Sequence, residues 1–446
     1  MSQYKAYTSY KDSGVEWIGQ VPEHWEVKRL RHVGRYSNSG VDKKSYEDQQ
    51  TVELCNYTDV YYNEFISDDM PFMQATASAH EIEQFTLKKG DVIITKDSED
   101  PSDIGIPAFV PHDMPGVVCG YHLTMIRALN DNYGSYIHRS IQSDHTRAHF
   151  FVESPGITRY GLNQNTIGNA PVALPPPEEQ ATIAATLDRE TARIDALVEK
   201  KIRFIELLKE KRQALITHAV TKGLDPNAKM KDSGIEWIGQ VPEHWKIAQI
   251  KRISALNPRK STLNEEKDSL CTFLPMEKLR TNAVTLDETR PIHEVYGGYS
   301  YFCDGDILIA KVTPCFENGN IAVANGLVNG IGFGSTEINV LRVNGKGHNR
   351  FLYYRLQEEQ FRTIAKSEMR GTGGLKRVPT ELFESFAIGL PDTDEQATIA
   401  ATLDRETARI DALIGKAEQS ITLLKERRAA FITAAVTGQI DLRGKQ

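Results

Sequence analysis

The chain has 446 residues, of which 40% are hydrophobic and 25% charged, and its formal net charge is −7. That length accommodates about two to four domains with separate cores. A polar N-terminus and no apolar run near the ~18 residues of a membrane span argue against a secreted or membrane protein and predict a cytoplasmic location. The five cysteines form no CxxC pair, which argues against a disulfide framework or a zinc site and predicts reduced core thiols.

An internal duplication organises the sequence. The stretch EQATIAATLDRETARIDAL occupies residues 179–197 and recurs unchanged at residues 395–413, a displacement of 216 (395 − 179). A second repeat, KDSGVEWIGQVPEHW at residues 11–25, returns with one substitution at residues 231–245, and all four tryptophans lie in its two copies. Two indoles beside a Val-Pro turn predict a segment anchored by buried aromatic area at both Trp17 and Trp25; a direct ligand role is the alternative.

The regions that follow each tryptophan segment have the texture of a mixed α+β domain. In the first region, β-branched and alternating runs predict strands, followed by one helix near residues 134–151; the strands are expected at residues 51–57, 91–96, 105–110 and 123–129. Residues 304–311 (DGDILIAK) answer residues 89–96 (KGDVIITK) at a displacement of 215 (311 − 96). We therefore expect one fold in both regions, and five segments along the chain: residues 1–25, 26–175, 176–245, 246–391 and 392–446.

Each of these regions ends in an apolar strand and a proline stop, after which a long helix begins. Acidic residues just after proline suit a helix N-terminus. Apolar residues recur in a heptad pattern over residues 178–221, and the second copy matches; the predicted seam is Leu187, Ile194, Leu208, Leu215, Ala184, Val198, Ile205 and Ala219, then Leu403, Ile410, Leu424, Phe431, Ala400, Ile414, Ile421 and Ala435. The pattern is interrupted at Lys201, Arg212 and Arg428. A helix of this length would measure roughly 65 Å, and its stripe needs a partner. We expect the two copies to pack antiparallel in one chain; a parallel pair is the alternative.

This organisation resembles the specificity subunit of type I restriction–modification systems, through the KDSGxEWIGxxPxHW opening, the LPxxxEQxxIAxxLD helix entry and the two variable regions between them. The resemblance covers nearly the whole chain. It implies two α+β target-recognition domains, each recognising one half of a split site in double-stranded DNA. It also implies an antiparallel coiled coil that sets the spacing and docks two methyltransferase subunits, joined by restriction subunits in the full complex. S-adenosylmethionine, ATP and Mg would belong to those partner subunits.

Motifs for catalysis in this chain were sought and not found. The run at residues 174–178 (LPPPE) lacks the residues that a DNA amino-methyltransferase needs around its prolines, and GxxxxGK[ST] is absent. Asp304, Asp306 and Lys311 could suggest a nuclease cluster, but we interpret them as a turn and a solvated strand end. We expect no catalytic, cofactor-binding or metal-binding residue here. The alternative function is a structural adaptor with two protein-binding domains, which the acidic net charge favours. Residues 345–380 favour DNA, since they carry eight basic and three acidic residues (8 − 3 = +5).

Candidate DNA-contacting residues lie in polar loops late in each region, where Asn and Gln suit adenine edges and Arg suits guanine. Two lysines that directly follow the GD strands are added as candidate phosphate contacts, with a solvated strand end as the alternative. The candidates are Lys96, Arg159, Tyr160, Asn163, Gln164 and Asn165, then Lys311, Arg370, Thr372, Lys376 and Arg377. The alternative is that these are ordinary surface loops. Candidate partner-binding residues are the charged positions off the helix seam that both copies share: Arg189, Glu190, Arg193 and Asp195, then Arg405, Glu406, Arg409 and Asp411. Recombination between the halves could also have made the copies identical.

Overall fold

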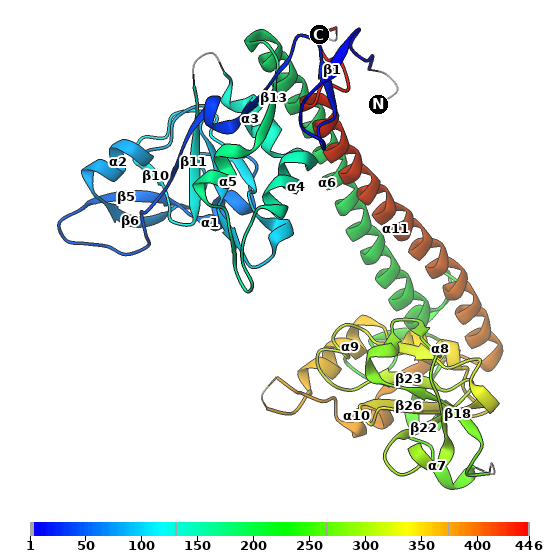
Figure 1. Cartoon of the computed structure of the whole chain (residues 1–446). Helices are drawn as coiled ribbons and strands as arrows, with labels where there is room; N and C mark the ends of the chain where they lie inside the picture. Colours follow the sequence, from blue (N-terminus) through cyan, green and yellow to red (C-terminus); the bar gives the residue numbers. More distant parts are fainter. Residues whose placement is uncertain (1–3, 130–131, 264–265, 373, 445–446) are drawn as a thin grey trace. The chain divides into compact units, whose positions relative to one another are not determined.

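The computed structural model describes residues 4–129, 132–263, 266–372 and 374–444. The chain divides into two compact units, Met1–Lys201 with Glu418–Gln446, and Ile202–Ala417. Two long helices contribute to both units (Figure 1). They are α6 (Pro177–Lys222) and α11 (Thr393–Val436). Each unit therefore holds one globular domain, one tryptophan segment and part of each long helix.

The domain of the first unit is built on two sheets. The antiparallel sheet has the order β4-β11-β7-β9 (Gly34–Asn38, Leu123–Ala128, Val92–Thr95, Pro107–Phe109). The other has the order β10-β5-β6 (Val117–Cys119, Gln50–Cys55, Met73–Ala77), with β10 parallel to β5. Two-stranded pairs are β1 with β2 (Tyr10–Asp12, Gln20–Pro22), β3 with β13 (Glu26–Arg29, Pro171–Leu174) and β8 with β12 (Asp97–Ser98, Tyr160–Gly161).

Short helices complete this domain: α1 (Tyr57–Tyr61), α2 (Ala79–Phe85), α3 (Gly134–Ile141), α4 (Asp144–Val152) and α5 (Gln164–Asn169), with 3-10 turns at Leu30–His32 and Pro101–Asp103. The predicted strands are confirmed, but the single helix expected near residues 134–151 is wrong. It is two helices, because the chain turns at Ser143, which is extended and accepts a hydrogen bond from the Thr146 amide as the N-cap of α4.

The domain of the second unit repeats this design. Its antiparallel sheet has the order β17-β26-β23-β24 (Ser254–Leu256, Ile338–Val343, Ile307–Ala310, Ile321–Val323). Its other sheet has the order β21-β18-β25-β22 (Thr289–Pro291, Leu270–Leu274, Ile331–Gly334, Ser300–Cys303), with β18 parallel to β25. The pairs are β14 with β15 (Met230–Asp232, Gln240–Pro242), β16 with β27 (Lys246–Gln249, Ala387–Leu390) and β19 with β20 (Leu279–Arg280, Ala283–Val284).

Its helices are α7 (Ile292–Val295), α8 (Asn349–Arg355), α9 (Glu359–Ser367) and α10 (Thr380–Ser385), with 3-10 turns at Ile250–Arg252, Lys260–Thr262, Met276–Lys278 and Val328–Gly330. The first sheets of the two domains match strand for strand, and each is flanked by a strand pair that joins the domain's entry to its exit. The prediction of one α+β fold used twice is confirmed.

The long helices pack antiparallel within each unit. In the first unit, Ala184 and Leu187 from the start of α6 share a core with Phe431 and Ala435 from the end of α11. In the second unit, a corresponding but separate core holds residues from the end of α6 and the start of α11, namely Ile216, Ala219, Ala400 and Leu403. Every predicted seam residue is buried or half-buried. The antiparallel pairing is therefore confirmed.

The two arginines that interrupt the predicted seam form ion pairs across the helix pair. Arg428 Nε lies 3.0 Å from Asp195 Oδ1, and Arg212 Nε lies 2.9 Å from Asp411 Oδ1. The two ion pairs are equivalent, because Arg428 corresponds to Arg212 and Asp195 corresponds to Asp411 in the two copies of the helix. At these two arginine positions of the heptad, an ionic contact between the helices thus replaces an apolar one.

Each tryptophan segment covers the place where one long helix begins and the other ends. Trp25 is fully buried, and its indole Nε1 donates to Glu179 Oε1 at 3.2 Å; Trp245 repeats this with Glu395 at 3.1 Å. The prediction that both indoles of each copy are buried is wrong for the first one. Trp17 is 49% exposed and Trp237 43% exposed, because only the second indole of each segment enters the junction of the helices.

Candidate nucleic-acid interface

The predicted DNA-contacting residues of the first domain fall into two groups. Arg159 and Tyr160 lie at β12, which pairs with β8 immediately after Lys96. The Leu162 amide donates to the Lys96 carbonyl at 2.7 Å, which fixes this loop beside the strand end. The Lys96 ammonium stands 4.5 Å from the centre of the Tyr121 ring. Lys96, Arg159 and Tyr160 therefore belong to one surface, at the ends of β7 and β12.

The second group lies at the start of α5. Asn163 caps that helix, accepting a hydrogen bond from the Thr166 amide at 2.9 Å. Asn163, Gln164 and Asn165 are all exposed. These residues line a pocket of about 630 Å3 together with Arg29 and His149. The helix cap is a structural reason for an asparagine at position 163. The prediction that Asn163 contacts DNA is therefore supported only by the exposed residues beside it.

Arg159 is held in place by a carboxylate that sequence reasoning missed. Its Nη2 lies 2.6 Å from Asp97 Oδ1, while His122 Nδ1 lies 2.7 Å from Asp97 Oδ2. Arg159 Nη2 also approaches His122 Nδ1 at 3.2 Å. Since that nitrogen must donate to Asp97, it cannot also accept from the arginine, and Asp97 is the partner of both. The hydrogen bond to Asp97, with its charge, raises the pKa of Arg159 above its ordinary value.

A pocket of about 400 Å3 opens beside this cluster. It is lined by Tyr57 and Tyr61, whose rings stack with centres 5.5 Å apart, and by acidic side chains that include Glu99 and Asp100. The Arg159 side chain, which is 58% exposed, also lines this pocket. Such a pocket offers flat aromatic faces and hydrogen-bond acceptors, but its negative charge is unfavourable for a phosphate.

In the second domain the predicted residues lie in a hairpin. The amides and carbonyls of Arg370 and Arg377 bond to each other at 2.9 and 2.8 Å, and the Lys376 amide donates to the Thr313 hydroxyl. Arg370, Thr372, Lys376 and Arg377 are all exposed, while Gly373 of this loop lies outside the described residues. The Val378 amide donates to the Lys311 carbonyl at 2.8 Å. The hairpin is thus tied to the end of β23 as the corresponding loop is tied to Lys96.

Arg377 is also bound by a carboxylate, that of Glu337. Nε and Nη2 of the arginine lie 2.9 and 2.6 Å from the two carboxylate oxygens. The hydrogen bond lowers the pKa of Glu337, against the opposing effect of burial. The sequence could have indicated Glu337. It lies directly before the strand in TEINVLR (residues 336–342), the segment that corresponds to HLTMIR (residues 122–127).

The positive balance of residues 345–380 is not a single exposed patch. Arg355 is fully buried, 2.8 Å from Glu358. Arg362 donates to the Phe316 carbonyl at 2.7 Å, and Arg350 binds Asp404. Arg355 and Arg362 are thus bound within the domain and Arg350 is bound to α11, so the count of +5 overstates the charge that this segment offers to DNA.

The acidic residues near Lys311 have a structural role. The buried Asp306 accepts two hydrogen bonds from Arg342, at 2.8 and 2.6 Å, and one from the Cys303 amide. Asp91 and Arg127 form the same pair in the first domain. Asp306 lies in the turn before β23, as expected, and its amide donates to the Cys303 carbonyl at 3.1 Å, but its side chain is buried by the pair with Arg342. In the described parts of the chain, no group of three His, Cys, Asp or Glu side chains is placed to hold a metal ion.

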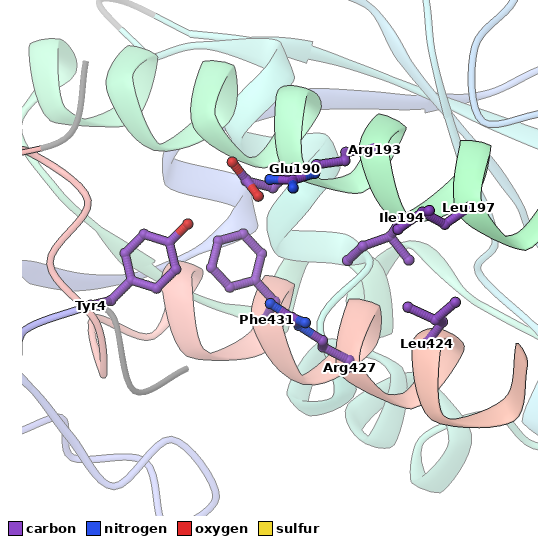
Figure 2. A pocket seen from close by; sticks show the side chains of 8 residues that line it. All are labelled: Tyr4, Glu190, Arg193, Ile194, Leu197, Leu424, Arg427 and Phe431. Atoms are coloured by element: carbon purple, nitrogen blue, oxygen red, sulfur yellow. The ribbon is translucent and has the colours of Figure 1, made fainter. Parts of the chain in front are cut away.

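The predicted partner-binding residues divide by contact. Asp195 and Asp411 are bound by Arg428 and Arg212, as described above. Arg189 lies 3.7 Å from Glu190, and Arg405 lies 3.1 Å from Glu406. Arg193 and Arg409 are exposed, and neither forms an ion pair within the described ranges. Glu190 and Arg193 border a pocket of about 220 Å3 between the helices, with Arg427, Phe431 and Tyr4 opposite (Figure 2).

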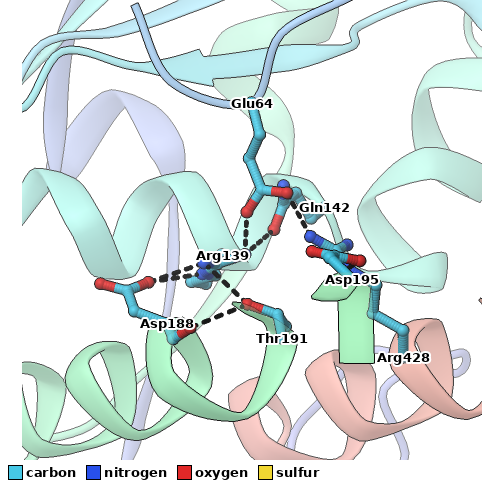
Figure 3. A network of polar contacts seen from close by, with 7 residues as sticks. All are labelled: Glu64, Arg139, Gln142, Asp188, Thr191, Asp195 and Arg428. Carbon is cyan, nitrogen blue, oxygen red and sulfur yellow. Dashed lines mark hydrogen bonds and ion pairs between the residues drawn. The ribbon is translucent and has the colours of Figure 1, made fainter. Parts of the chain in front are cut away.

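A polar network that the sequence did not predict joins the first domain to both helices (Figure 3). The buried Arg139 of α3 binds Asp188 of α6 at 2.7 Å and also Glu64, and Glu64 in turn binds Arg428 of α11. Burial raises the pKa of Glu64, but the charges of Arg139 and Arg428 outweigh it, and the net pKa is lowered. This network fixes the domain on the helix pair.

Two copies of one α+β domain, each fixed to an antiparallel pair of long helices, define a class of duplicated, two-domain subunits. The model of the type I restriction modification DNA specificity domain matches residues 22–207 and 242–423. The chain belongs to this family. Among the residues that the structure describes, no helix is both long and apolar enough to cross a membrane.

Relatives support the same assignment. The chain is 31% identical to the type I restriction enzyme EcoEI specificity subunit of Escherichia coli over 199 residues, which are 44% of this chain and 33% of that relative. It is 24% identical to the putative type I restriction enzyme MjaX specificity subunit of Methanocaldococcus jannaschii, over 96% of each chain. A solved structure from work on complex assembly and conformational transition of the type I R-M system covers 94% of this chain and 99% of its own, with a TM-score of 0.70 at 17% identity. That likeness shows a shared fold.

Proposed function

We propose that this chain is the DNA-recognition subunit of a type I restriction–modification complex, in which each domain recognises one half of a bipartite site. The observation that carries the proposal is the contrast between scaffold and surface. The two domains keep the same strand order in their antiparallel sheets and are attached to identical helix segments. Their exposed loops differ, with Arg159 and Tyr160 in one and Arg370, Thr372 and Lys376 in the other. A reader of two different half-sites needs this combination, because protein geometry sets the half-site spacing.

In this proposal the helix pair has two roles. It sets the gap between the half-sites, and its repeated exposed residues give the same docking surface to each of two methyltransferase subunits. The exposed Arg193 and Arg409 support docking, together with Arg189, Glu190, Arg405 and Glu406. Asp195 and Asp411 contribute less, because each is already bound by an arginine of the opposite helix. S-adenosylmethionine and ATP chemistry, with its Mg, is assigned to partner subunits, and the chain itself is proposed to be non-catalytic.

The test uses the chain's own duplication. Replacing residues 26–175 by a second copy of residues 246–391 gives a variant in which both domains are the second one. The graft keeps its helix contact, because the Asp404 and Thr407 that this domain binds recur as Asp188 and Thr191. The methylated motif of a strain that carries the chain and its methyltransferase is then mapped.

We expect the variant to methylate a motif that contains the second half-site twice, with the gap unchanged. The unaltered chain is the control and should give two different half-sites. A motif that keeps the first half-site, or a changed gap, would contradict the division of roles between domains and helices. An adaptor with protein-binding domains would give no sequence-dependent methylation from either chain.

A further inference from the structure

Both domains place an arginine held by a carboxylate at the same point of the fold. The Lys96 amide donates to the His122 carbonyl, and the Lys311 amide donates to the Glu337 carbonyl, both at 3.0 Å. Positions 122 and 337 therefore correspond. The late loops are tied to the same two lysine carbonyls through Leu162 and Val378, as described above. Arg159 and Arg377 thus reach the same edge of the sheet from equivalent loops, although Arg159 lies three residues before Leu162 and Arg377 one residue before Val378.

The carboxylate that holds each arginine comes from a different position. In the first domain it is Asp97, one residue after Lys96 in β8; in the second it is Glu337, just before β26. Asp97 has Val312 at the corresponding place, since 97 + 215 = 312, and Glu337 has His122. Two diverged sequences thus reach one arrangement by different substitutions. A role shared by the two arginines accounts for this better than the shared fold does.

The chemistry of the pair favours a base over a phosphate. A guanidinium has five N–H donors, and Arg377, whose side chain is 48% exposed, uses Nε and Nη2 on Glu337, which leaves the Nη1 hydrogens and one further N–H free. The pair carries no net charge, and a phosphate that approached it would be repelled by the carboxylate. The neutral acceptors O6 and N7 of guanine are not repelled, and they match an arginine fork.

The adjacent lysines suit phosphate instead. Neither Lys96 nor Lys311 has an ion pair within the described part of the chain, so no carboxylate competes with a phosphate for either ammonium group. A lysine for the backbone and a fixed arginine for a base edge is the division that sequence-specific contacts require. The fixed arginine also loses little side-chain freedom when it binds.

On the proposed function that these domains recognise DNA, we propose that Arg159 and Arg377 each recognise a guanine, one in each half-site. Asp97 and Glu337 are positioning residues that hold the two guanidinium groups. Lys96 and Lys311 contact the neighbouring phosphates.

The test begins with the motif of the unaltered complex, mapped from methylated host DNA. If no bipartite motif appears, the proposed function itself fails. If it appears, each half-site must contain at least one G·C pair, and a half-site of A·T pairs alone would overturn the assignment for that domain. Arg377→Gln and Arg159→Gln are then assembled with the methyltransferase subunits and assayed on duplexes in which each position of the motif is varied.

We expect Arg377→Gln to lower the preference for guanine at one position of one half-site by roughly 10- to 100-fold. The other half-site should be unchanged, and Arg159→Gln should act on that other half-site alone. Glu337→Gln should reduce the same preference by a smaller factor. Lys311→Gln is the matched control, which should weaken binding to all sequences alike and reduce the salt dependence by about one ion.

Either of two outcomes would overturn the inference. If both arginine variants kept every base preference and changed only thermal stability, the arginine–carboxylate pairs would only stabilise the conformation of the late loops. If they weakened all duplexes equally, as Lys311→Gln is expected to do, they would be phosphate contacts. Circular dichroism of each variant checks folding, and Arg377→Lys, which keeps the charge but loses the fork, should still lose the guanine preference.

Discussion

The repeated aspartate of the long helices is bound in both units, but by arginines at different positions of the two domains. In the first unit, Asp188 is bound by Arg139 of α3. In the second, Asp404 is bound by Arg350 of α8 and by the Tyr354 hydroxyl at 2.7 Å. The Tyr133 and His348 amides both donate to the repeated glutamine of the long helix, so these two residues correspond. Six residues further along, Tyr354 occupies the place of Arg139, and Arg350 stands about one turn before it.

A second difference concerns the opposite helix. In the first unit, Glu64 of the domain binds Arg139 and also Arg428 of α11. In the second, Arg350 donates to the amide oxygen of Asn282 at 2.9 Å, and Arg212 binds Asp411. The first domain is thus tied by charge to both helices, whereas charged contacts tie the second to α11. The repeated helix surface presents the same aspartate to both domains. Each diverged domain binds it with a different set of side chains.

The largest expected effect breaks what the two units share. Trp25→Ala should destabilise the first unit by roughly 3–5 kcal/mol, because a fully buried indole is removed and Glu179 loses a donor. Trp245→Ala should do the same to the second unit. Urea unfolding, followed by hydrogen exchange in peptides of each unit, measures the effect. The half-exposed Trp17 is the matched control, and its alanine variant should cost less than about 1 kcal/mol; equal effects at positions 17 and 25 would contradict this.

A smaller effect separates the two units. Arg139→Met should destabilise the first unit by about 3 kcal/mol, because its fully buried side chain is lost together with its bonds to Glu64, Asp188 and Thr191. Arg350→Met should cost about 1 kcal/mol, since that arginine is partly exposed and Tyr354 still donates to Asp404. The same exchange measurement applies. An equal cost in both units would mean that burial of the arginine is not what distinguishes them.

The smallest effect is a difference in acid sensitivity. Burial, followed by the charge of Arg139, lowers the pKa of His138 from 6.5 to about 3. The unfolded chain therefore binds a proton that the folded unit does not, and this contribution to stability is complete above pH 6.5 and falls as the pH is lowered towards 3. At pH 5 the loss is about 2 kcal/mol. Denaturant midpoints between pH 7 and 5 measure it, and His138→Leu should remove this part of the slope; an unchanged slope would refute the assignment.

The fold was predictable where one residue pattern has one physical solution. The heptad over residues 178–221, present twice in one chain, requires an apolar partner, and the other copy provides it. The expected strands also appeared, because β-branched runs such as residues 91–96 bury both faces in the sheet. The helix near residues 134–151 was mispredicted, since the cap by Ser143 competes with helix continuation and leaves only a weak signal in the sequence.

The candidate site was predictable only in part. Arg159 and Arg377 were named from residue type, but their partners Asp97 and Glu337 come from strand ends 62 and 40 residues away in the sequence. Asn163 was named for its amide, which the structure uses as a helix cap. Trp17 and Trp25 look alike in the sequence, and only the packing at Glu179 distinguishes the exposed indole from the buried one.

By itself the sequence determined the duplication, the two domains, the long helices and the family, because periodicity and repetition are properties of the order of residues. Only the tertiary structure decided which charges are free and which are bound. Arg428 and Asp195 lie on different helices, and Arg139 and Glu64 meet only when the domain has folded onto them. A charge's environment depends on neighbours brought together in space, so which arginines are exposed and which are bound becomes visible only in the folded chain.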